Sequence, residues 1–133
     1  MKIAVMKETF EGETRVPLIP PTVEKLTKLG AEMEIESGLG LTCRYEDSDY
    51  EKAGAKINSD RQNMLQSADI VLRLRKPPMD DVGLMKKGCI HISYLDPFNE
   101  LAMVDKMKEC GISCAVASRI ACSSAVISLG VIW

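Results

Sequence analysis

The sequence predicts an α/β domain, a three-layer sandwich with a mainly parallel sheet of the flavodoxin-like or Rossmann-like kind. Two observations lead to this prediction. Short apolar segments rich in β-branched residues alternate with segments of helical periodicity, and the connections between them are short. Strands that alternate with helices need crossover connections, which place the strands in parallel and cover both faces of the sheet with helices.

Six segments have the pattern of strands. Residues 69–74, with the sequence DIVLRL, form the clearest one, because they are apolar and β-branched and are followed by two consecutive prolines. Residues 31–36 alternate between apolar and polar side chains, which is typical of a half-buried strand. The other strands are expected at residues 3–6, 55–57, 89–94 and 112–117.

The segments between the strands have start and stop signals of helices. The pair Pro20-Pro21 opens the first helix, because proline is favoured in a first turn, and Gly30 ends it as a C-terminal cap. Acidic residues 46–51 lead a short helix that stops at Gly54. Further helices are expected at residues 61–67, 80–87 and 100–110.

Composition narrows the class of protein. The 133 residues suffice for one domain with a sizeable core. The 17 basic and 19 acidic residues are intermixed, so no basic face for nucleic acid is indicated. We expect neither a signal peptide nor a membrane-spanning helix, because no apolar run is long enough. The five cysteines lack the spacing of a zinc site or a disulfide framework, and we expect them to be reduced in a cytosolic protein.

Arginines follow two of the predicted strands. Arg15 lies in the charged loop after the first strand, and Arg73 and Arg75 end the strand at residues 69–74. Ligands of α/β proteins gather beyond the carboxyl ends of the strands, so these cations could form one rim that binds a carboxylate or a phosphate. Two alternatives stay open: Arg15 pairs with Glu11 or Glu13 in its own loop, and the strand end is merely solvated.

Two other features are weak candidates for chemistry. Residues 37–40, SGLG, resemble the opening of a dinucleotide fingerprint, but the third glycine position is Cys43 and an acidic segment follows. We interpret them as a turn. His91, the single histidine, lies in an alternating strand, and we expect a hydrogen-bonded strand residue rather than a catalyst.

The sequence of residues 7–20, KETFEGETRVPLIP, closely resembles the opening of the alanine dehydrogenase and nicotinamide nucleotide transhydrogenase N-terminal domain family. The resemblance covers about residues 1–120 and continues through residues 28–30, 36–40, 50–55 and 68–73. Within the family, residues 94–99, YLDPFN, are more similar to the alpha subunit of the proton-translocating NAD(P) transhydrogenase than to alanine dehydrogenase.

The resemblance also distinguishes the branches of the family. Alanine dehydrogenases have a substrate-binding arginine that Arg15 matches. They also have a lysine at the end of the strand that corresponds to residues 69–74, where this chain has Arg73. Their catalytic histidine falls at Asp96, and an aspartate cannot replace a cationic acid. We therefore expect the transhydrogenase branch. A fragment of an alanine dehydrogenase-like enzyme and a non-catalytic α/β binding module are the alternatives.

The transhydrogenase branch implies hydride transfer from NADH to NADP, coupled to proton translocation. The resemblance implies a homodimer that binds NAD(H), docks on membrane-embedded transhydrogenase subunits, and lies in the cytoplasm, peripheral to the inner membrane. No catalytic residue is expected in this chain, because the nicotinamide pair supplies the chemistry. A family loop that contacts NAD is matched only by Arg119 and Ile120.

The last residues depart from the family. Residues 121–133 are apolar and uncharged, a composition prone to aggregation when exposed. The dinucleotide-binding fold of the family follows the N-terminal domain. We therefore expect a domain at residues 1–120, an aberrant tail at residues 121–133, and truncation or a frame shift before the NAD-binding domain. The isolated chain is then expected to be inactive and to bind NADH weakly or not at all.

Overall fold

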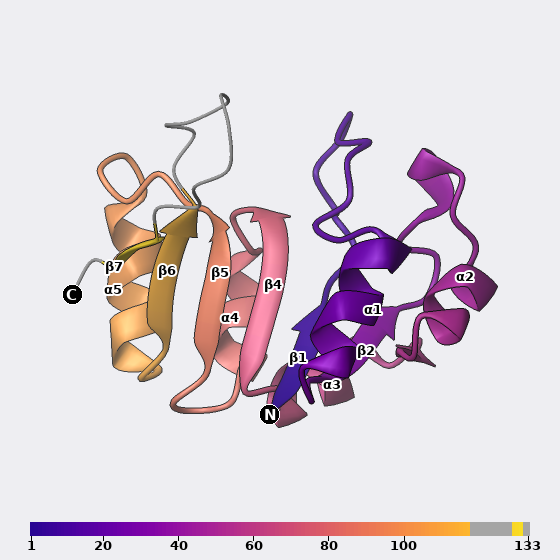
Figure 1. Ribbon diagram of the computed structural model, residues 1–133. Coiled ribbons are helices and arrows are strands. Elements are labelled where there is room, and N and C mark those ends of the chain that lie inside the picture. Colours follow the sequence, from indigo (N-terminus) through magenta and orange to yellow (C-terminus); the bar gives the residue numbers. More distant parts are fainter. Residues whose placement is uncertain (118–128, 132–133) are drawn as a thin grey trace.

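The computed structural model describes residues 1–117 and 129–131 (Figure 1). Its sheet contains seven strands in the order β3-β2-β1-β4-β5-β6-β7. Each neighbouring pair among β1 to β6 is parallel, whereas β7 runs antiparallel to β6. The order of the six parallel strands is that of the Rossmann fold, not of flavodoxin, and the predicted α/β class is confirmed.

All six predicted strands are present, with ends shifted by at most one residue. Their bounds are Lys2–Val5 (β1), Glu32–Glu36 (β2), Lys56–Asn58 (β3), Ile70–Arg75 (β4), Ile90–Tyr94 (β5) and Ser113–Ala117 (β6). The sequence did not predict the short strand β7, Leu129–Val131. It extends the sheet beyond β6.

The predicted helices are also present, and two of them are shorter than expected. Their bounds are Pro20–Lys28 (α1), Asp47–Lys52 (α2), Arg61–Ser67 (α3), Met79–Leu84 (α4) and Leu101–Glu109 (α5), with a 3₁₀ turn at Leu41–Cys43 (η1). Helix α4 stops before Met85, which adopts an extended conformation. Gly30 and Gly54 have φ values of 89° and 91°, the left-handed conformation that ends a helix. No helix in the described residues is long and apolar enough to cross a membrane.

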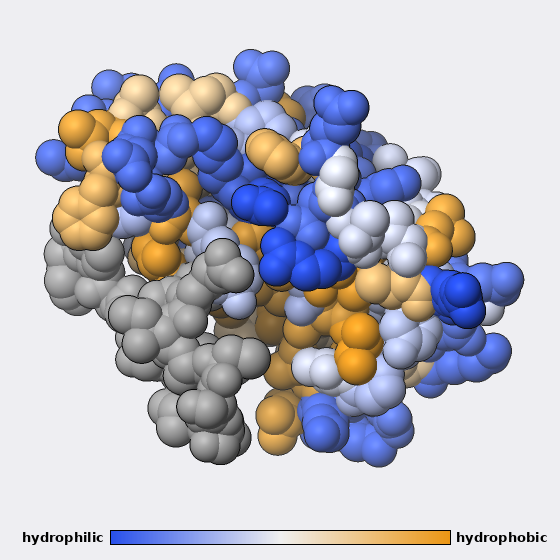
Figure 2. Space-filling model, turned by 90° about the horizontal axis from the view of Figure 1, so that it is seen from above, coloured by the Kyte–Doolittle hydropathy of each residue, from blue (hydrophilic) through white to orange (hydrophobic). Residues whose placement is uncertain are grey.

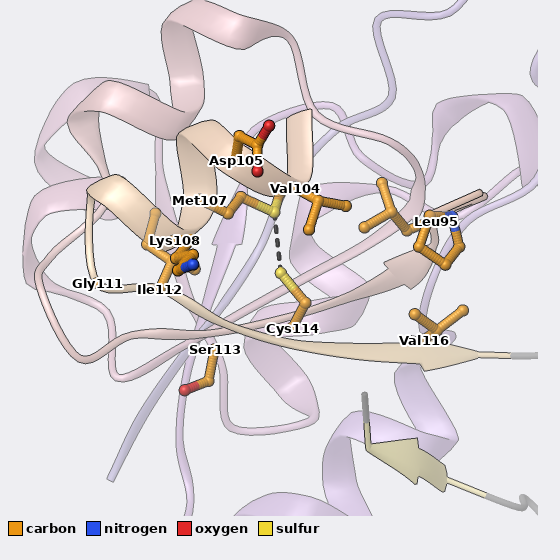
Figure 3. A pocket seen from close by; sticks show the side chains of 11 residues that line it. Leu95, Val104, Asp105, Met107, Lys108, Gly111, Ile112, Ser113, Cys114 and Val116 are labelled. Atoms are coloured by element: carbon orange, nitrogen blue, oxygen red, sulfur yellow. Dashed lines mark hydrogen bonds between the residues drawn. The ribbon is translucent and has the colours of Figure 1, made fainter. Parts of the chain in front are cut away.

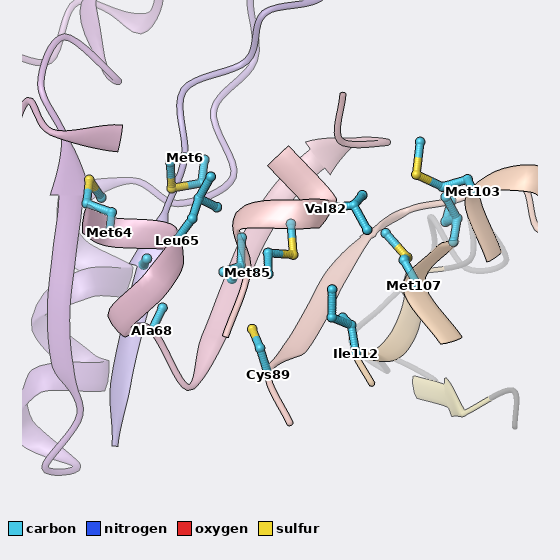
Figure 4. Packing of buried hydrophobic residues seen from close by; sticks show 13 residues of the cluster. Met6, Met64, Leu65, Ala68, Val82, Met85, Cys89, Met103, Met107 and Ile112 are labelled. Atoms are coloured by element: carbon cyan, nitrogen blue, oxygen red, sulfur yellow. The ribbon is translucent and has the colours of Figure 1, made fainter. Parts of the chain in front are cut away.

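Helices cover both faces of the sheet, although unevenly. Helix α1 packs against β2 and helix α2 against β3 on one face, and α3, α4 and α5 lie on the other (Figure 1). The larger core cluster fills the space between the sheet and these three helices (Figure 4), with members such as Met6, Met64, Leu65, Val82 and Met107. Each fully buried side chain of this size contributes roughly 1.5–3 kcal/mol.

Strand β2 departs from the predicted half-buried pattern. Met33, Glu34 and Ile35 are all buried, so both faces of the strand are covered. The buried Glu34 carboxylate is compensated by Lys2, whose Nζ lies 2.9 Å from Oε2, and by a hydrogen bond of 3.0 Å from Asn58 Nδ2. A central parallel strand is normally covered on both faces, which the alternating residues of a short segment do not reveal.

The order in which the strands follow one another reverses between β1 and β4. Strands β2 and β3 follow on one side of β1, and strands β5 and β6 follow on the far side of β4. In folds with this strand order the connections diverge at this point, and the crevice at the carboxyl ends of the two strands is where ligands bind. Residues 6–19 after β1 and residues 76–78 after β4 border this crevice.

Candidate functional site

Three charged side chains meet at the carboxyl ends of β1 and β4. Glu13 accepts hydrogen bonds of 2.7 Å from both Nε and Nη2 of Arg15. Its Oε2 atom also accepts a hydrogen bond of 2.7 Å from Arg75 Nε. We call Glu13, Arg15 and Arg75 the rim cluster. Figure 2 views this end of the molecule, where hydrophilic side chains gather in the upper part of the view and hydrophobic ones in the lower centre.

The Glu13 carboxylate of the rim cluster is buried, whereas the side chains of Arg15 and Arg75 are exposed. The Glu13 side chain is 3% exposed, whereas the side chains of Arg15 and Arg75 are 59% and 45% exposed. The hydrogen bonds from Arg15 and then Arg75 hold the pKa of Glu13 well below its usual range, and the same contact raises the pKa of Arg15. Glu13 and Arg15 therefore stay charged at physiological pH. The guanidinium of Arg75 also lies 5.0 Å from the ring centroid of Phe10.

Arg15 and Arg73 were the predicted anion-binding residues, and the structure does not bring them together. The Arg73 side chain is 1% exposed, and its Nη1 donates a hydrogen bond of 2.8 Å to Asp81. Arg75 lies beside Arg15 instead. Residues two apart in a strand normally share one face, but the pairing of β4 with β5 shifts register between Leu72 and Arg75. Arg73 consequently points into the core and Arg75 to the surface.

Arg73 belongs to a second group, the buried charge cluster, which consists of Glu8, Glu36, Arg61, Arg73 and Asp81. Asp81 accepts hydrogen bonds from Arg73 and, at 2.6 Å, from Arg61 Nη2. Arg61 Nη1 donates a further hydrogen bond of 2.6 Å to Glu36. The cluster connects the first loop, β2, α3, β4 and α4. Burial lowers the pKa of Arg73, which its acidic neighbours partly offset.

His91 contributes to the core. It is 1% exposed, and its Nε2 lies 3.0 Å from Ser93 Oγ. Burial and the nearby charge of Arg73 lower the pKa of His91 to about 4, so the ring is neutral at physiological pH. The interpretation of His91 as a hydrogen-bonded strand residue is confirmed.

Comparison with known families identifies the fold. A family model described as "Alanine dehydrogenase/PNT, N-terminal domain" matches residues 4–126. The chain belongs to this family. Its members are oxidoreductases, as the names of the related proteins show, and the resemblance derived from the sequence motifs is confirmed.

Both branches of the alanine dehydrogenase/PNT family are represented among the relatives. NAD(P) transhydrogenase subunit alpha from Cereibacter sphaeroides is 32% identical over 111 residues, which are 84% of this chain and 21% of that protein. Alanine dehydrogenase 1 from Staphylococcus aureus is 34% identical over 113 residues, which are 85% of this chain and 30% of that protein. These identities do not separate the two branches.

Solved structures agree with the sequences. The transhydrogenase from Sinorhizobium meliloti superimposes with a TM-score of 0.83 and 28% identity, covering 91% of this chain and 37% of that chain. A structure of L-alanine dehydrogenase superimposes with the same TM-score of 0.83 and 26% identity, covering 88% of this chain and 32% of that chain. The chain thus spans about a fifth to a third of its relatives' lengths.

The residues at the crevice do not fit a dinucleotide. Helix α1 begins with Pro20 and Pro21, so its first turn lacks two of the N–H groups that a pyrophosphate needs. The glycines after β2 serve packing instead. Gly38 N donates to Asp47 Oδ1 at 2.8 Å, and a methyl group at Gly40 would come within 2.7 Å of Tyr45 Cβ. The interpretation of this segment as a turn is confirmed.

The remaining predicted site residues are Arg119 and Ile120, which lie outside the residues that the structure describes. Sequence reasoning also missed several residues that the structure brings into contact. Glu36, Arg61 and Asp81 are far apart along the chain, and no local motif marks them. In the described ranges, no group of histidine, cysteine, aspartate and glutamate side chains could hold a metal ion.

A hollow lies between α5 and β6 (Figure 3). Its volume is about 630 Å³, and Leu95, Val104, Met107, Cys114 and Val116 provide most of its apolar lining. Cys114 Sγ lies 2.9 Å from Met107 Sδ. Burial raises the pKa of the Cys114 thiol, so the sulfur stays protonated and unreactive.

Proposed function

We propose that this chain is the N-terminal domain of a transhydrogenase of the alpha-subunit type. In that enzyme a hydride passes from NADH to NADP, and the transfer is coupled to proton translocation. Membership of the alanine dehydrogenase/PNT family supports an oxidoreductase in general. The choice of the transhydrogenase branch depends on the chemistry at the crevice.

The observation that favours this branch is the position of Glu13. Oxidation of an amino acid needs a place for a small carboxylate, and a pair of arginines at the crevice would suit it. Here Glu13 already binds both arginines, accepting three hydrogen bonds of 2.7 Å. A substrate carboxylate would have to displace this internal carboxylate. Hydride transfer between two nicotinamide nucleotides needs no small carbon substrate and tolerates the closed rim.

Asp96 supports the same choice. It is exposed at the start of the loop after β5, and its Oδ2 accepts a hydrogen bond of 2.6 Å from Asn99 Nδ2. The resemblance places the catalytic histidine of alanine dehydrogenases at this position. The side chain here has no imidazole to donate a proton to a substrate carbonyl.

The cofactor and partners are parts of the same proposal. Because the start of α1 does not suit a pyrophosphate, we assign NAD(H) binding to parts of the family's proteins beyond the described residues. We further propose a homodimer that docks on membrane-embedded transhydrogenase subunits, in the cytoplasm and peripheral to the inner membrane. Family membership alone supports this assembly.

Ligand titration tests the closed rim. We expect the melting temperature of the chain to stay unchanged in millimolar pyruvate or L-alanine, because Glu13 occupies the arginines. The alternative is an alanine dehydrogenase-like domain, favoured by the proximity of Arg15 and Arg75. A rise in melting temperature with pyruvate that is lost in Arg15→Ala would establish this alternative and refute our proposal.

A further inference from the structure

The end of β4 has backbone donors that the sheet does not satisfy. Pairing between β1 and β4 stops at Val5 and Leu72, followed by a hydrogen bond of 3.1 Å from Met6 N to Leu72 O. The chain then leaves the sheet as the first loop. Glu8 in this loop provides the missing acceptor. Its Oε1 accepts hydrogen bonds from Leu74 N at 2.6 Å and from Arg75 N at 3.2 Å.

The Glu8 carboxylate is itself held in place. Its side chain is 4% exposed, and Oε2 lies 3.6 Å from Arg73 Nη2. Arg73 Nη2 also lies 3.4 Å from the carbonyl oxygen of Lys7 and from Thr9 Oγ1. Lys7 N donates a hydrogen bond of 2.7 Å to Glu36. The segment on either side of Glu8 is therefore fixed from β2 and from β4.

The position of Glu8 connects the two charged groups of the molecule. On one side it belongs to the buried charge cluster through Arg73. On the other side it holds the backbone of Arg75, whose side chain donates to Glu13. Pairing of β4 with β1 ends at Leu72, whereas pairing with β5 resumes at Arg75 after the register shift, so Glu8 replaces the missing partner on the β1 side.

We propose that Glu8 is a positioning residue: by capping the end of β4, it places Arg75 where Glu13 can bind it together with Arg15. The acceptor oxygen of Glu8 performs this role, and its negative charge serves the separate purpose of balancing Arg73. The inference concerns the geometry of the rim cluster and does not depend on the branch of the family.

Two conservative variants separate the oxygen from the charge. Glu8→Gln keeps an acceptor oxygen at the same distance from the backbone but loses the charge. Glu8→Asp keeps the charge but withdraws the carboxylate by one methylene from Leu74 N. The readouts are the hydrogen exchange of the Leu74 amide and the titration of the Glu13 carboxyl, both followed by NMR. Glu11, exposed in the same loop, provides matched controls as Glu11→Gln and Glu11→Asp.

We expect Glu8→Asp to raise the pKa of Glu13, because Arg75 no longer donates to it in a fixed position. The Leu74 amide should exchange roughly tenfold faster, as the loss of a charged acceptor implies. Glu8→Gln should change neither readout, although it lowers the melting temperature. The negative charge cannot explain this pattern, since Glu8→Asp preserves the charge.

An unchanged Glu13 titration in Glu8→Asp overturns the proposal. A rise in the pKa of Glu13 that is as large in Glu8→Gln as in Glu8→Asp also overturns it, because the charge of Glu8 would then matter rather than the cap. If Glu8→Asp does not fold, Glu8→Gln decides alone: a retained low pKa of Glu13 with a protected Leu74 amide supports the role, and a raised pKa refutes it.

Discussion

Glu13 accepts a hydrogen bond at each carboxylate oxygen from the guanidinium of Arg15, both at 2.7 Å. The two residues are separated by one position in the first loop, and Arg75 from β4 completes the group. An arginine pair at the carboxyl ends of two parallel strands would otherwise be a receptor for a substrate carboxylate. In this chain the carboxylate of Glu13, from the first loop, already binds both arginines.

Removal of the Glu13 carboxylate should create an anion-binding site at Arg15 and Arg75. In Glu13→Gln the two arginines lose their shared carboxylate, and the exposed guanidinium groups become available to a ligand. We expect pyruvate to raise the melting temperature of this variant and not that of the natural chain. Glu11→Gln is the matched control, since it removes one charge from the same loop at an exposed position. A Glu13→Gln variant without pyruvate-dependent stabilisation would show that the arginines are not arranged for a carboxylate.

The buried charge cluster should dominate the response of stability to charge removal. Arg73→Met leaves Glu8 without its counter-charge in the interior, and breaking a buried ion pair in this way costs about 3–5 kcal/mol. Lys28→Met, which breaks an exposed pair with Glu24, should cost less than about 1 kcal/mol. Urea denaturation measures both free energies of unfolding. Equal values for the two variants would contradict the role assigned to the cluster.

His91 should make stability depend on pH. Its pKa is lowered to about 4 in the folded chain from 6.5, so the unfolded chain binds a proton first as the pH falls. The stabilisation is fully present above pH 6.5 and is lost as the pH falls towards 4, by about 3 kcal/mol. The free energy of unfolding of His91→Gln, measured across this range, should lack this component. Parallel curves for the two proteins would show that His91 titrates normally.

Two glycines should respond oppositely to alanine. Gly40→Ala places a methyl group 2.7–2.8 Å from Tyr45 and Tyr50, and such overpacking costs about 1–3 kcal/mol. Gly83 lies within α4 with no heavy atom near its Cβ position, so Gly83→Ala should stabilise the chain by up to about 1 kcal/mol. Thermal unfolding compares the two variants. A neutral Gly40→Ala would mean that the turn does not need the close approach.

The elements of the fold were predictable because their signals are local. The prolines at the start of α1 and Gly30 at its end mark that helix in the sequence itself. The end of α4 was predicted three residues too late, since nothing in the sequence signals that Met85 turns extended. The burial of Glu34 depends on Lys2 and Asn58, which reach it only through the sheet.

The candidate site was predictable only in part. The pairing of Arg15 with Glu13 was one of the alternatives open from the sequence, because the two residues are neighbours in one loop. The exchange of roles between Arg73 and Arg75 was not foreseeable, since it follows from a register shift in β4. The contact of Arg61 with Asp81 joins two helices and depends entirely on tertiary structure.

Reciprocal chimeras test the transhydrogenase assignment most directly. Residues of this chain replace the matched segment of the NAD(P) transhydrogenase subunit alpha of Cereibacter sphaeroides and, separately, that of alanine dehydrogenase 1 of Staphylococcus aureus. Each chimera is checked for folding and assayed for the activity in its parent's name. We expect hydride transfer from NADH to NADP to persist in the first chimera and alanine oxidation to be lost in the second. A folded first chimera without transfer, beside a second that oxidises alanine, would contradict the account.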